Sequence, residues 1–310
     1  MSDLPLVSIV VVSYNQGQYI RENLDSIKAQ TYPNIELIVA DDASPDNSVE
    51  IFKEWLSENH YVAKTNFHTI NTGLATVLNE CIEWATGKYI KLIAADDYLH
   101  PESIEKCVLK LEELGDQYGM VSSDTYCVDE NSTVQPDFAD FNSIGNIPPS
   151  KLHDVLIAGN RFATLTVLMR TDVVRETGEY HAEFLVEDYQ RWLMISEKYF
   201  ISYIPEKLAF YRVHPENISK AKADRILAED RMLQMRFDHH GLVRNVINDY
   251  MQNIYAGKKE ISSDLRQRYA TYPFRMKVLA FCLQYHIPNI VYQIIFSLSL
   301  RLRLQLPILI

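Results

Sequence analysis

The sequence predicts an α/β fold, in which a Rossmann-like, mixed but mostly parallel sheet is flanked by helices and followed by a C-terminal helical extension. Two observations carry this prediction. In the first 115 residues, β-branched apolar runs of strand length alternate with segments whose apolar residues repeat at helical spacing. From about residue 221 onward the helical spacing continues without this alternation. We therefore expect one domain over residues 1–220 and a helical region over residues 221–310.

The elements of the first 115 residues follow in order. The run VSIVVVS has strand length and contains no turn residue, and IELIVA repeats this pattern. Gly87 is a typical helix end and Pro101 a typical helix start. The expected strands lie at residues 7–13, 35–40 and 90–95. The expected helices lie at residues 15–30, 44–56, 73–87 and 101–114, and a short segment near 67–70 precedes the third of them.

The middle of the chain is less regular. Residues 128–151 are polar, rich in Pro and Asn and without periodicity, which predicts a long loop. Loops of this size in compact domains are usually functional or disordered, and this one is a candidate lid. Residues 153–174 are expected to form a helix and a strand that return the chain to the sheet.

Three predicted strands end in polar clusters. These are Ser13-Tyr14-Asn15, Asp41-Asp42 and Asp96-Asp97. A single Asp pair is usually a solvated turn. Three clusters at three carboxyl ends instead predict one shared crevice, because ligands of parallel α/β sheets bind beyond those ends. No GxGxxG or GxxxxGK[ST] sequence follows a strand, which argues against dinucleotide-binding and P-loop proteins.

The charge is divided unevenly along the chain. The net charge is −11, but residues 221–310 hold 13 Lys and Arg against 7 Asp and Glu, which leaves 17 basic and 34 acidic residues in 1–220. An acidic first domain argues against nucleic-acid binding. A phosphorylated ligand would need a divalent cation to offset the acidity. The four cysteines are scattered and form no CxxC pair, which predicts free thiols. The first apolar run is too short for a secretory signal, and both observations favour a cytoplasmic protein.

The ordered series of motifs resembles the family 2 glycosyltransferases of the GT-A fold. The resemblance rests on VSIVVVSYN, IELIVADDASPDNS, NTGLATVLNECIEWATG, IKLIAADDYLHPES, FLVEDYQRW and LAFYRVHPENIS, and it covers roughly residues 5–220. It implies transfer of a sugar, with inversion, from a nucleotide-sugar donor that is expected to be a UDP-sugar. The acceptor is expected to be a carbohydrate or lipid-linked sugar in surface polysaccharide or glycan assembly.

The resemblance implies a donor site at the three strand ends. Tyr14 would stack on the base, Asp41 would accept a hydrogen bond from it, and Asp42 would support that loop. Thr76 departs from the family pattern, which often has Arg there, and this puts one phosphate or base contact in doubt. The expected nucleotide-sugar-binding residues are Val12, Ser13, Tyr14, Asp41, Asp42, Asn79, Ala95 and Asp96.

The resemblance also implies a metal site for Mn²⁺ or Mg²⁺. Asp96 matches the metal-binding carboxylate of the family, and His214 in YRVHPE is a candidate second ligand. Ala94 replaces the first acid of the family pattern, which puts metal affinity and the ribose contact in doubt. One carboxylate can still suffice when phosphates and water complete the coordination. For Asp97, a role at the metal and a role in capping the loop before Pro101 both stay open.

The acids in VEDY are the expected catalytic residues. Acids are favoured at any helix N-terminus, so Glu187 and Asp188 alone would be unremarkable. In the family the second acid takes the proton of the acceptor hydroxyl, which assigns the general base to Asp188, with Glu187 next in line. The alternative is a catalytically impaired nucleotide-sugar-binding protein. A nucleotidyltransferase is weakly supported, because SYNQGQ holds no Lys or Arg before Arg21.

The C-terminal region is uncharged from Val278 to Leu300. Its length suggests a transmembrane helix, but Pro288 and several amide residues argue against one and predict two short helices instead. These helices could pack on the catalytic domain, form a homodimer, or lie on the inner face of a membrane. Four basic residues would then lie near anionic headgroups: Arg275, Lys277, Arg301 and Arg303.

Overall fold

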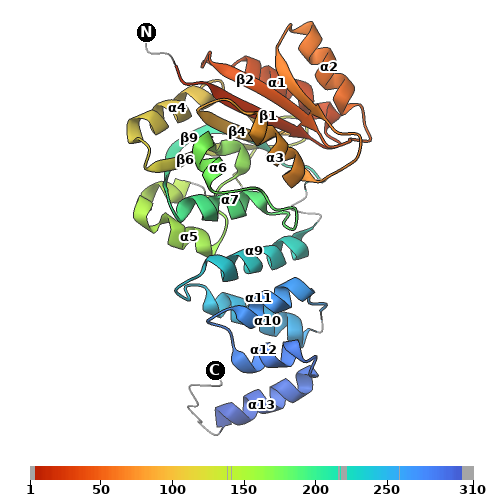
Figure 1. Ribbon diagram of the computed structural model, residues 1–310, viewed down its shortest axis with the longest axis vertical. Coiled ribbons are helices and arrows are strands. Elements are labelled where there is room, and N and C mark those ends of the chain that lie inside the picture. Colours follow the sequence, from red (N-terminus) through yellow and green to blue (C-terminus); the bar gives the residue numbers. More distant parts are fainter. Residues whose placement is uncertain are drawn as a thin grey trace. The chain divides into compact units, whose positions relative to one another are not determined.

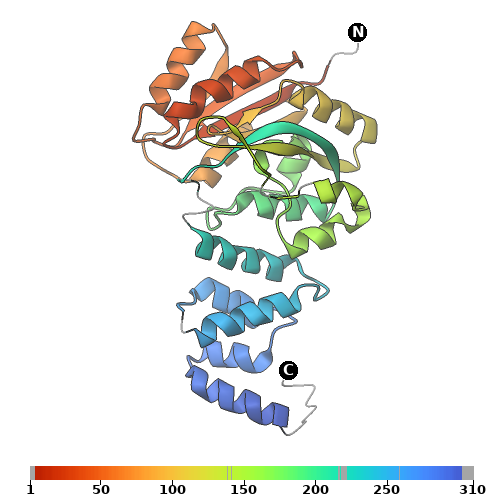
Figure 2. The same ribbon diagram turned by 180° about the vertical axis from the view of Figure 1, so that it is seen from behind.

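The computed structural model describes residues 4–137, 139–140, 142–215, 217, 222–257 and 259–301, with the side chains of 298–301 left out. Arg303 of the predicted basic group therefore lies outside the described residues, as does the side chain of Arg301. The chain divides into two compact units (Figures 1 and 2). The first comprises Met1–His153 and Arg161–Ala221, and the second comprises Asp154–Asn160 and Lys222–Ile310.

The first unit alternates strands and helices. Its strands are β1 (Val7–Ser13), β2 (Ile35–Asp41), β3 (Ala63–Phe67), β4 (Tyr89–Ala94), β5 (Tyr98–Leu99), β6 (Tyr118–Val128), β7 (Val134–Gln135), β8 (Leu168–Arg170) and β9 (Phe200–Arg212). Its helices are α1 (Gly17–Lys28), α2 (Ser48–Glu58), α3 (Leu74–Trp84), α4 (Ser103–Leu114), α6 (Thr171–Glu176) and α7 (Glu187–Ser196). Short 3₁₀ helices lie at Asn142–Asn146, Pro149–Lys151 and Thr164–Thr166, and α5 (Leu152–Ala158) passes from the first unit into the second.

Nine strands of the described chain form one mixed sheet. Their order is β3-β2-β1-β4-β8-β6-β9-β5, with β7 paired to β6. The first four strands of this order pair in parallel, and the helices α1, α2 and α3 form the crossovers between strands that follow one another in the chain. β8 then pairs antiparallel with β4 and β6, whereas β9 returns parallel to β6. The predicted α/β class is therefore confirmed.

The apolar runs of the parallel strands are continuous because both faces of the sheet are covered. Val7, Ile9 and Val11 of β1 belong to a buried cluster that also includes residues of α1, α2 and α4. Val10, on the opposite face of the same strand, is buried as well, and α3 contacts β1 and β2. The turn between α3 and β4 needs Gly87, because a Cβ atom there would lie 2.6 Å from the backbone nitrogen of Ser8.

The structure corrects several sequence predictions. The third strand is 63–67 rather than a segment near 67–70. Residues 128–151 are not a structureless loop, since they contain β7 and two 3₁₀ helices. Two of the longest strands, β6 and β9, lie in segments for which the sequence predicted none. β6 was missed because Ser, Asp and Thr interrupt its apolar pattern, and β9 because it contains Pro and charged residues.

The second unit is helical, as expected. It contains α9 (Ala223–Phe237), α10 (Arg244–Ala256), α11 (Ser263–Thr271), α12 (Lys277–Gln284) and α13 (Asn289–Arg301). Pro288 lies between α12 and α13, so the apolar segment forms the two predicted short helices. Over the described residues, no helix combines the length and the apolar character that a membrane span requires.

Candidate active site

The three polar clusters meet at one edge of the sheet. β1 pairs in parallel with β2 so that Ser13 lies opposite Asp41. The backbone N–H of Asp42 donates to the carbonyl of Ser13 at 3.2 Å, and the N–H of Ala95 donates to the carbonyl of Val12 at 3.0 Å. The Asp pair after Ala95 therefore follows directly on the strand beside β1, and the predicted convergence is confirmed.

A serine that sequence reasoning missed joins the loops after β1 and β2. The hydroxyl of Ser44 donates to Asp41 Oδ2 at 2.5 Å and accepts from the N–H of Asn15 at 2.9 Å. Its own N–H donates to Asp41 Oδ1 at 2.8 Å. Asp41 has no exposed surface, and burial raises the pKa of its carboxyl against the opposing effect of these hydrogen bonds. Asp41 thus lies beneath the loop, and Ser44 lies between it and Asn15.

The same two loops hold backbone conformations that favour glycine. Asn15 has φ 57° and Ala43 has φ 59°. An L-residue in this left-handed region costs roughly 1 kcal/mol, more for Ala than for Asn. Tyr14, next to Asn15, leaves 52% of its surface exposed. The loops are therefore fixed in shape, and an aromatic ring is accessible at their surface.

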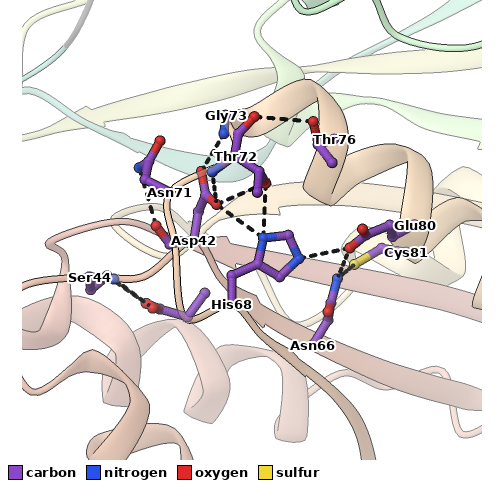
Figure 3. A network of polar contacts seen from close by, with 11 residues as sticks. Asp42, Ser44, Asn66, His68, Asn71, Thr72, Gly73, Thr76, Glu80 and Cys81 are labelled. Atoms are coloured by element: carbon purple, nitrogen blue, oxygen red, sulfur yellow. Dashed lines mark hydrogen bonds and ion pairs between the residues drawn. The ribbon is translucent and has the colours of Figure 1, made fainter.

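Asp42 organises the loop that leads into α3 (Figure 3). Its carboxylate accepts the N–H of Thr72 and the N–H of Gly73, each at 2.8 Å. Its carbonyl accepts the amide of Asn71 at 3.1 Å. Gly73 has φ 88°, so a glycine is favoured at this turn. The expectation that Asp42 supports a loop agrees with these contacts, although the supported loop comes from a third segment of the chain.

His68 extends this network to the side of α3 (Figure 3). Its Nδ1 lies 3.1 Å from Asp42 Oδ1 and 2.9 Å from Thr72 Oγ1, and its Nε2 lies 2.7 Å from Glu80 Oε2. The same Glu80 oxygen accepts the amide of Asn66 at 2.8 Å. No motif in the sequence marked His68. Only the parallel pairing of β2 with β3 places it beside Asp42.

Asp96 and His214 form the buried polar pair at the end of β4. His214 Nε2 lies 3.1 Å from Asp96 Oδ2, and both side chains are less than one tenth exposed. The N–H of His214 donates to Asn217 Oδ1 at 2.6 Å, and its ring lies 5.5 Å from the ring of Tyr19. The sequence-predicted metal ligands are therefore neighbours in space.

The geometry of this pair fits two adjacent positions around a divalent cation. Two ligand atoms at about 2.1 Å from a metal and at right angles lie about 3 Å apart, close to the observed separation. A carboxylate oxygen and an imidazole nitrogen are also ligand types that Mn²⁺ accepts. No group of three or more His, Cys, Asp or Glu gathers as a metal site among the residues that the structure describes. The remaining positions would therefore fall to donor phosphates and water.

Asp97 has a different environment from Asp96. Its Oδ1 accepts the backbone N–H of Arg212 at 2.9 Å, and its carbonyl accepts the amide of Asn23 at 2.8 Å. The helix α4 has Glu102 as its N-cap residue and no side-chain cap, so Asp97 does not cap it. Burial and the neighbouring Asp96 carboxylate raise the pKa of Asp97 well above its ordinary value. The side chain of Asp97 is thus used to hold the end of β9.

Arg212 is the buried cation at this acidic edge. Its guanidinium donates to the carbonyl of Asp96 at 2.7 Å and to the carbonyl of Asp129 at 2.9 Å. It also pairs with the carboxylate of Glu22, and it lies 4.5 Å from the ring centroid of Tyr19. These contacts connect α1, β4 and β9. Arg212 therefore stabilises the backbone that carries the Asp96–His214 pair.

The predicted catalytic acids lie in the first turn of α7, and both are partly exposed. Asp188 Oδ2 accepts the hydroxyl of Thr164 at 3.2 Å, and Oδ1 accepts the N–H of Tyr189 at 2.5 Å. Thr164 begins the 3₁₀ helix that precedes β8. Asp188 is thus held at a helix N-terminus with both of its carboxyl oxygens accepting hydrogen bonds, and part of its surface is exposed to solvent.

Asn79 connects α3 to the segment before α7. Its side-chain amide donates to the carbonyl of Tyr180 at 3.0 Å, and its side-chain oxygen accepts the N–H of Tyr180 at 2.8 Å. The sequence predicted that Asn79 faces the donor diphosphate. In the structure, its side-chain amide instead makes hydrogen bonds to the backbone of Tyr180. Thr76, one turn earlier, donates to the carbonyl of Thr72 at 3.1 Å.

Comparisons with known proteins identify the family. The sequence model of Glycosyl transferase family 2 matches residues 8–172. A glycosyltransferase of Haemophilus influenzae without an assigned role is 30% identical over 71% of this chain and 69% of its own. The putative teichuronic acid biosynthesis glycosyltransferase TuaG of Bacillus subtilis is 26% identical over 70% of this chain and 83% of its own. The chain belongs to glycosyl transferase family 2.

Solved structures agree with this fold. Residues 1–349 of TarS from S. aureus, in complex with UDP-GlcNAc, align with a TM-score of 0.66 at 17% identity over 90% of this chain and 86% of theirs. The mannosyltransferase PcManGT from Pyrobaculum calidifontis, in complex with GDP-Man and Mn²⁺, aligns with a TM-score of 0.56 at 17% identity over 96% of this chain and 81% of its own. Both alignments support the GT-A fold.

Proposed function

We propose that this glycosyltransferase moves a sugar, with inversion, from a UDP-sugar to a hydroxyl group of a carbohydrate or lipid-linked acceptor, with Mn²⁺ or Mg²⁺ as cofactor. The observation that carries the proposal is the Asp96–His214 pair, buried at the carboxyl edge of the sheet beside the loops after β1 and β2. The TarS complex with UDP-GlcNAc supports a nucleotide-sugar donor for this fold.

The donor base would lie on the loops after β1, β2 and β3. Tyr14 offers an exposed ring for stacking, and backbone atoms of Val12 and Ser13 would line the nucleoside site. The carboxylate of Asp41 would accept a hydrogen bond from the base in place of the one it now accepts from Ser44. Alternatively, it would hold the loop in shape through its hydrogen bonds with Ser44. Ala95 would lie under the ribose, and Asn79 would position the segment before α7.

Asp96 and His214 would hold the cation together with the donor diphosphate. When bound, such a cation offsets the charge that develops on the leaving nucleotide. The complex of PcManGT with Mn²⁺ supports a metal in this fold. Arg212 keeps the pair in place but does not face the cation as a ligand, because its guanidinium is bound to backbone carbonyls and to Glu22.

Asp188 would serve as the general base. The acceptor oxygen forms a bond to the anomeric carbon as the bond from that carbon to the diphosphate oxygen breaks. The hydroxyl proton passes to the carboxylate of Asp188, and the nucleoside diphosphate leaves with the electron pair. Attack from the face opposite the leaving group inverts the anomeric carbon. Thr164 orients the carboxylate through Oδ2.

The acceptor would belong to polysaccharide assembly. TuaG is described as acting in teichuronic acid biosynthesis, and its similarity extends over most of both chains. This supports a polymer or its lipid-linked precursor as the acceptor. We propose in addition that the protein works at the cytoplasmic side of a membrane.

The donor and metal proposal is tested by thermal unfolding with UDP. UDP should raise the melting temperature strongly only with Mn²⁺ or Mg²⁺ present, since binding to the folded state stabilises it by mass action. Asp96→Ala should remove this metal-dependent increase, whereas the surface variant Asp249→Ala should keep it. Asp41→Ala should weaken UDP binding with and without metal. Equal stabilisation by UDP in EDTA would contradict the metal assignment.

A further inference from the structure

The last two helices each present apolar side chains to solvent. On α13, Ile290 is 71% exposed and Ile294 54% exposed, with Val291 and Ile295 exposed beside them. The spacing i, i+1, i+4, i+5 puts these four residues on one helix face. Tyr292, on the other side of α13, is fully buried. The exposed face is therefore not the side by which α13 packs into its own unit.

α12 shows a similar stripe. Phe281 and Tyr285 are exposed and one turn apart, with ring centroids 4.7 Å from each other. Lys277 is exposed one turn before Phe281, so it lies on the same side of the helix. α12 and α13 contact each other at the end of the helical unit (Figures 1 and 2). We name the exposed apolar residues of both helices the terminal apolar face: Phe281, Tyr285, Ile290, Val291, Ile294 and Ile295.

The charge around this face contrasts with the rest of the chain. The whole sequence has a net charge of −11, yet after Asp264 it contains six Lys or Arg and no Asp or Glu. Arg275 lies just before α12, Lys277 is the first residue of α12, and Arg301 is the last residue of α13. Basic residues therefore lie at both ends of the segment that holds the terminal apolar face.

We propose that the terminal apolar face binds the surface of an anionic lipid bilayer. Isoleucine and aromatic side chains would enter the boundary between headgroups and acyl chains, and the basic residues would pair with anionic headgroups. The proposed contact is with the surface of the bilayer and not across it.

The charge favours lipid over a second copy of the chain. In a symmetric dimer the same patch meets itself. Lys277 lies on the same side of α12 as Phe281 and Tyr285, and the sequence contains no Asp or Glu after Asp264 that could pair with it, so the two copies of the patch would repel each other. An anionic bilayer instead attracts them. The inference does not depend on the proposed donor or metal, because it concerns residues of the second unit only.

Vesicle flotation of the full-length protein tests the proposal. The protein should float with vesicles of equal parts phosphatidylglycerol and phosphatidylcholine and much less with phosphatidylcholine alone. Ile290→Ser combined with Ile294→Ser should weaken binding at least about tenfold, since two apolar side chains no longer enter the bilayer. Lys277→Glu should weaken it several-fold, with a larger effect at low salt.

Matched surface variants serve as controls. Leu109→Ser removes an exposed leucine from α4, and Lys53→Glu reverses an exposed lysine of α2. Both should float like the wild-type protein. Circular dichroism melting should show that the double isoleucine variant is folded. The proposal is overturned if wild-type protein does not bind anionic vesicles, or if the double variant binds them normally. A dimer in sedimentation that this variant dissociates, without vesicle binding by the wild type, would identify the face as a subunit interface.

Discussion

His214 Nε2 lies 3.1 Å from Asp96 Oδ2, although 118 positions separate the two residues in the chain. The pairing of β5 with β9 brings the segment after β4 beside β9, and the bond from Asp97 to the N–H of Arg212 fixes the end of that strand two residues before His214. A carboxylate and an imidazole are thus held at the separation that adjacent ligands of one cation require.

This relationship predicts the effect of replacing the imidazole. His214→Gln should weaken Mn²⁺ binding in the presence of UDP by roughly 10- to 100-fold, because one ligand is lost while Asp96 remains. Calorimetric titration of Mn²⁺ into the UDP complex measures the change. His240→Gln, which alters an exposed histidine of the second unit, should have no effect. Unchanged Mn²⁺ affinity in His214→Gln would remove His214 from the metal site.

The proposed general base, Asp188, gives a second prediction. Asp188→Asn should leave UDP and metal affinity nearly intact, whereas transfer should fall by about 10²- to 10⁴-fold, the usual contribution of a positioned general base. The substitution is nearly isosteric, so packing is preserved. A transfer assay beside calorimetry for UDP with Mn²⁺ separates the two effects.

Two outcomes of that experiment would change the assignment. Glu187→Gln is the matched control on the same helical turn and should reduce transfer far less. Transfer at the wild-type rate in Asp188→Asn would move the base to another residue, with Glu187 examined next. A loss of UDP affinity as large as in Asp96→Ala would place Asp188 in the donor site instead.

The loop before α3 gives a third prediction. Asp42→Asn should weaken UDP binding equally in Mn²⁺ and in EDTA. One carboxylate oxygen of Asp42 accepts the N–H of Thr72 and the other accepts the N–H of Gly73. An amide has only one acceptor oxygen, so one of these two hydrogen bonds is lost. It should also lower the free energy of unfolding by about 1–3 kcal/mol, the usual penalty for a backbone donor that loses its partner. Calorimetry and urea denaturation test the two effects, with Asp249→Asn as the control. A defect restricted to Mn²⁺ would instead connect Asp42 to the metal.

Lys91 gives a prediction about stability and pH. It lies in β4 with no exposed surface, its ammonium donates to the carbonyl of Val167 at 3.3 Å, and burial lowers its pKa from 10.5 to about 8. Below pH 8 the folded protein bears the full penalty of a buried charge. Between pH 8 and 10.5 the folded state binds fewer protons than the unfolded state, so stability should rise with pH.

Lys91→Met should therefore stabilise the protein at pH 7, by about 1–3 kcal/mol in the free energy of unfolding. The advantage should shrink as the pH rises toward 10.5, because the side chain of Lys91 is then neutral in the folded state and loses its proton in the unfolded state as well. Urea denaturation at the two pH values measures this, and Lys53→Met should be neutral. A variant that is less stable at pH 7 would mean that the bond to Val167 outweighs the cost of the buried charge.

Much of the fold could be predicted from local sequence patterns. The alternation of β-branched runs and helical stripes predicted β1, β2, β4 and the helices between them, since such strands are buried on both faces and need continuous apolar residues. β6 was not predictable in this way. Its Ser122 and Thr125 are buried because Thr166 Oγ1 and the carbonyl of Ala209 satisfy their hydroxyls, and those partners come from distant segments.

β9 was hidden for a related reason. Pro205 interrupts its sequence, and Pro cannot donate to a strand ladder. The pairing with β6 passes from Ile204 directly to Lys207, so an irregularity in the ladder accommodates Pro205 and Glu206. Whether a proline is tolerated in a strand depends on its neighbour in the sheet, which is not a local property of the sequence.

The sequence by itself determined the family, the parallel half of the sheet and the polar residues at its carboxyl edge, because these depend on local patterns and on motifs in a fixed order. Only the tertiary structure decided which of those residues meet. It placed His214 beside Asp96, used Asp97 to bind the backbone of Arg212, and brought His68 into contact with Asp42. Hydrogen bonds between residues far apart in the chain form only when the strands bring them together, so no local pattern could encode these choices.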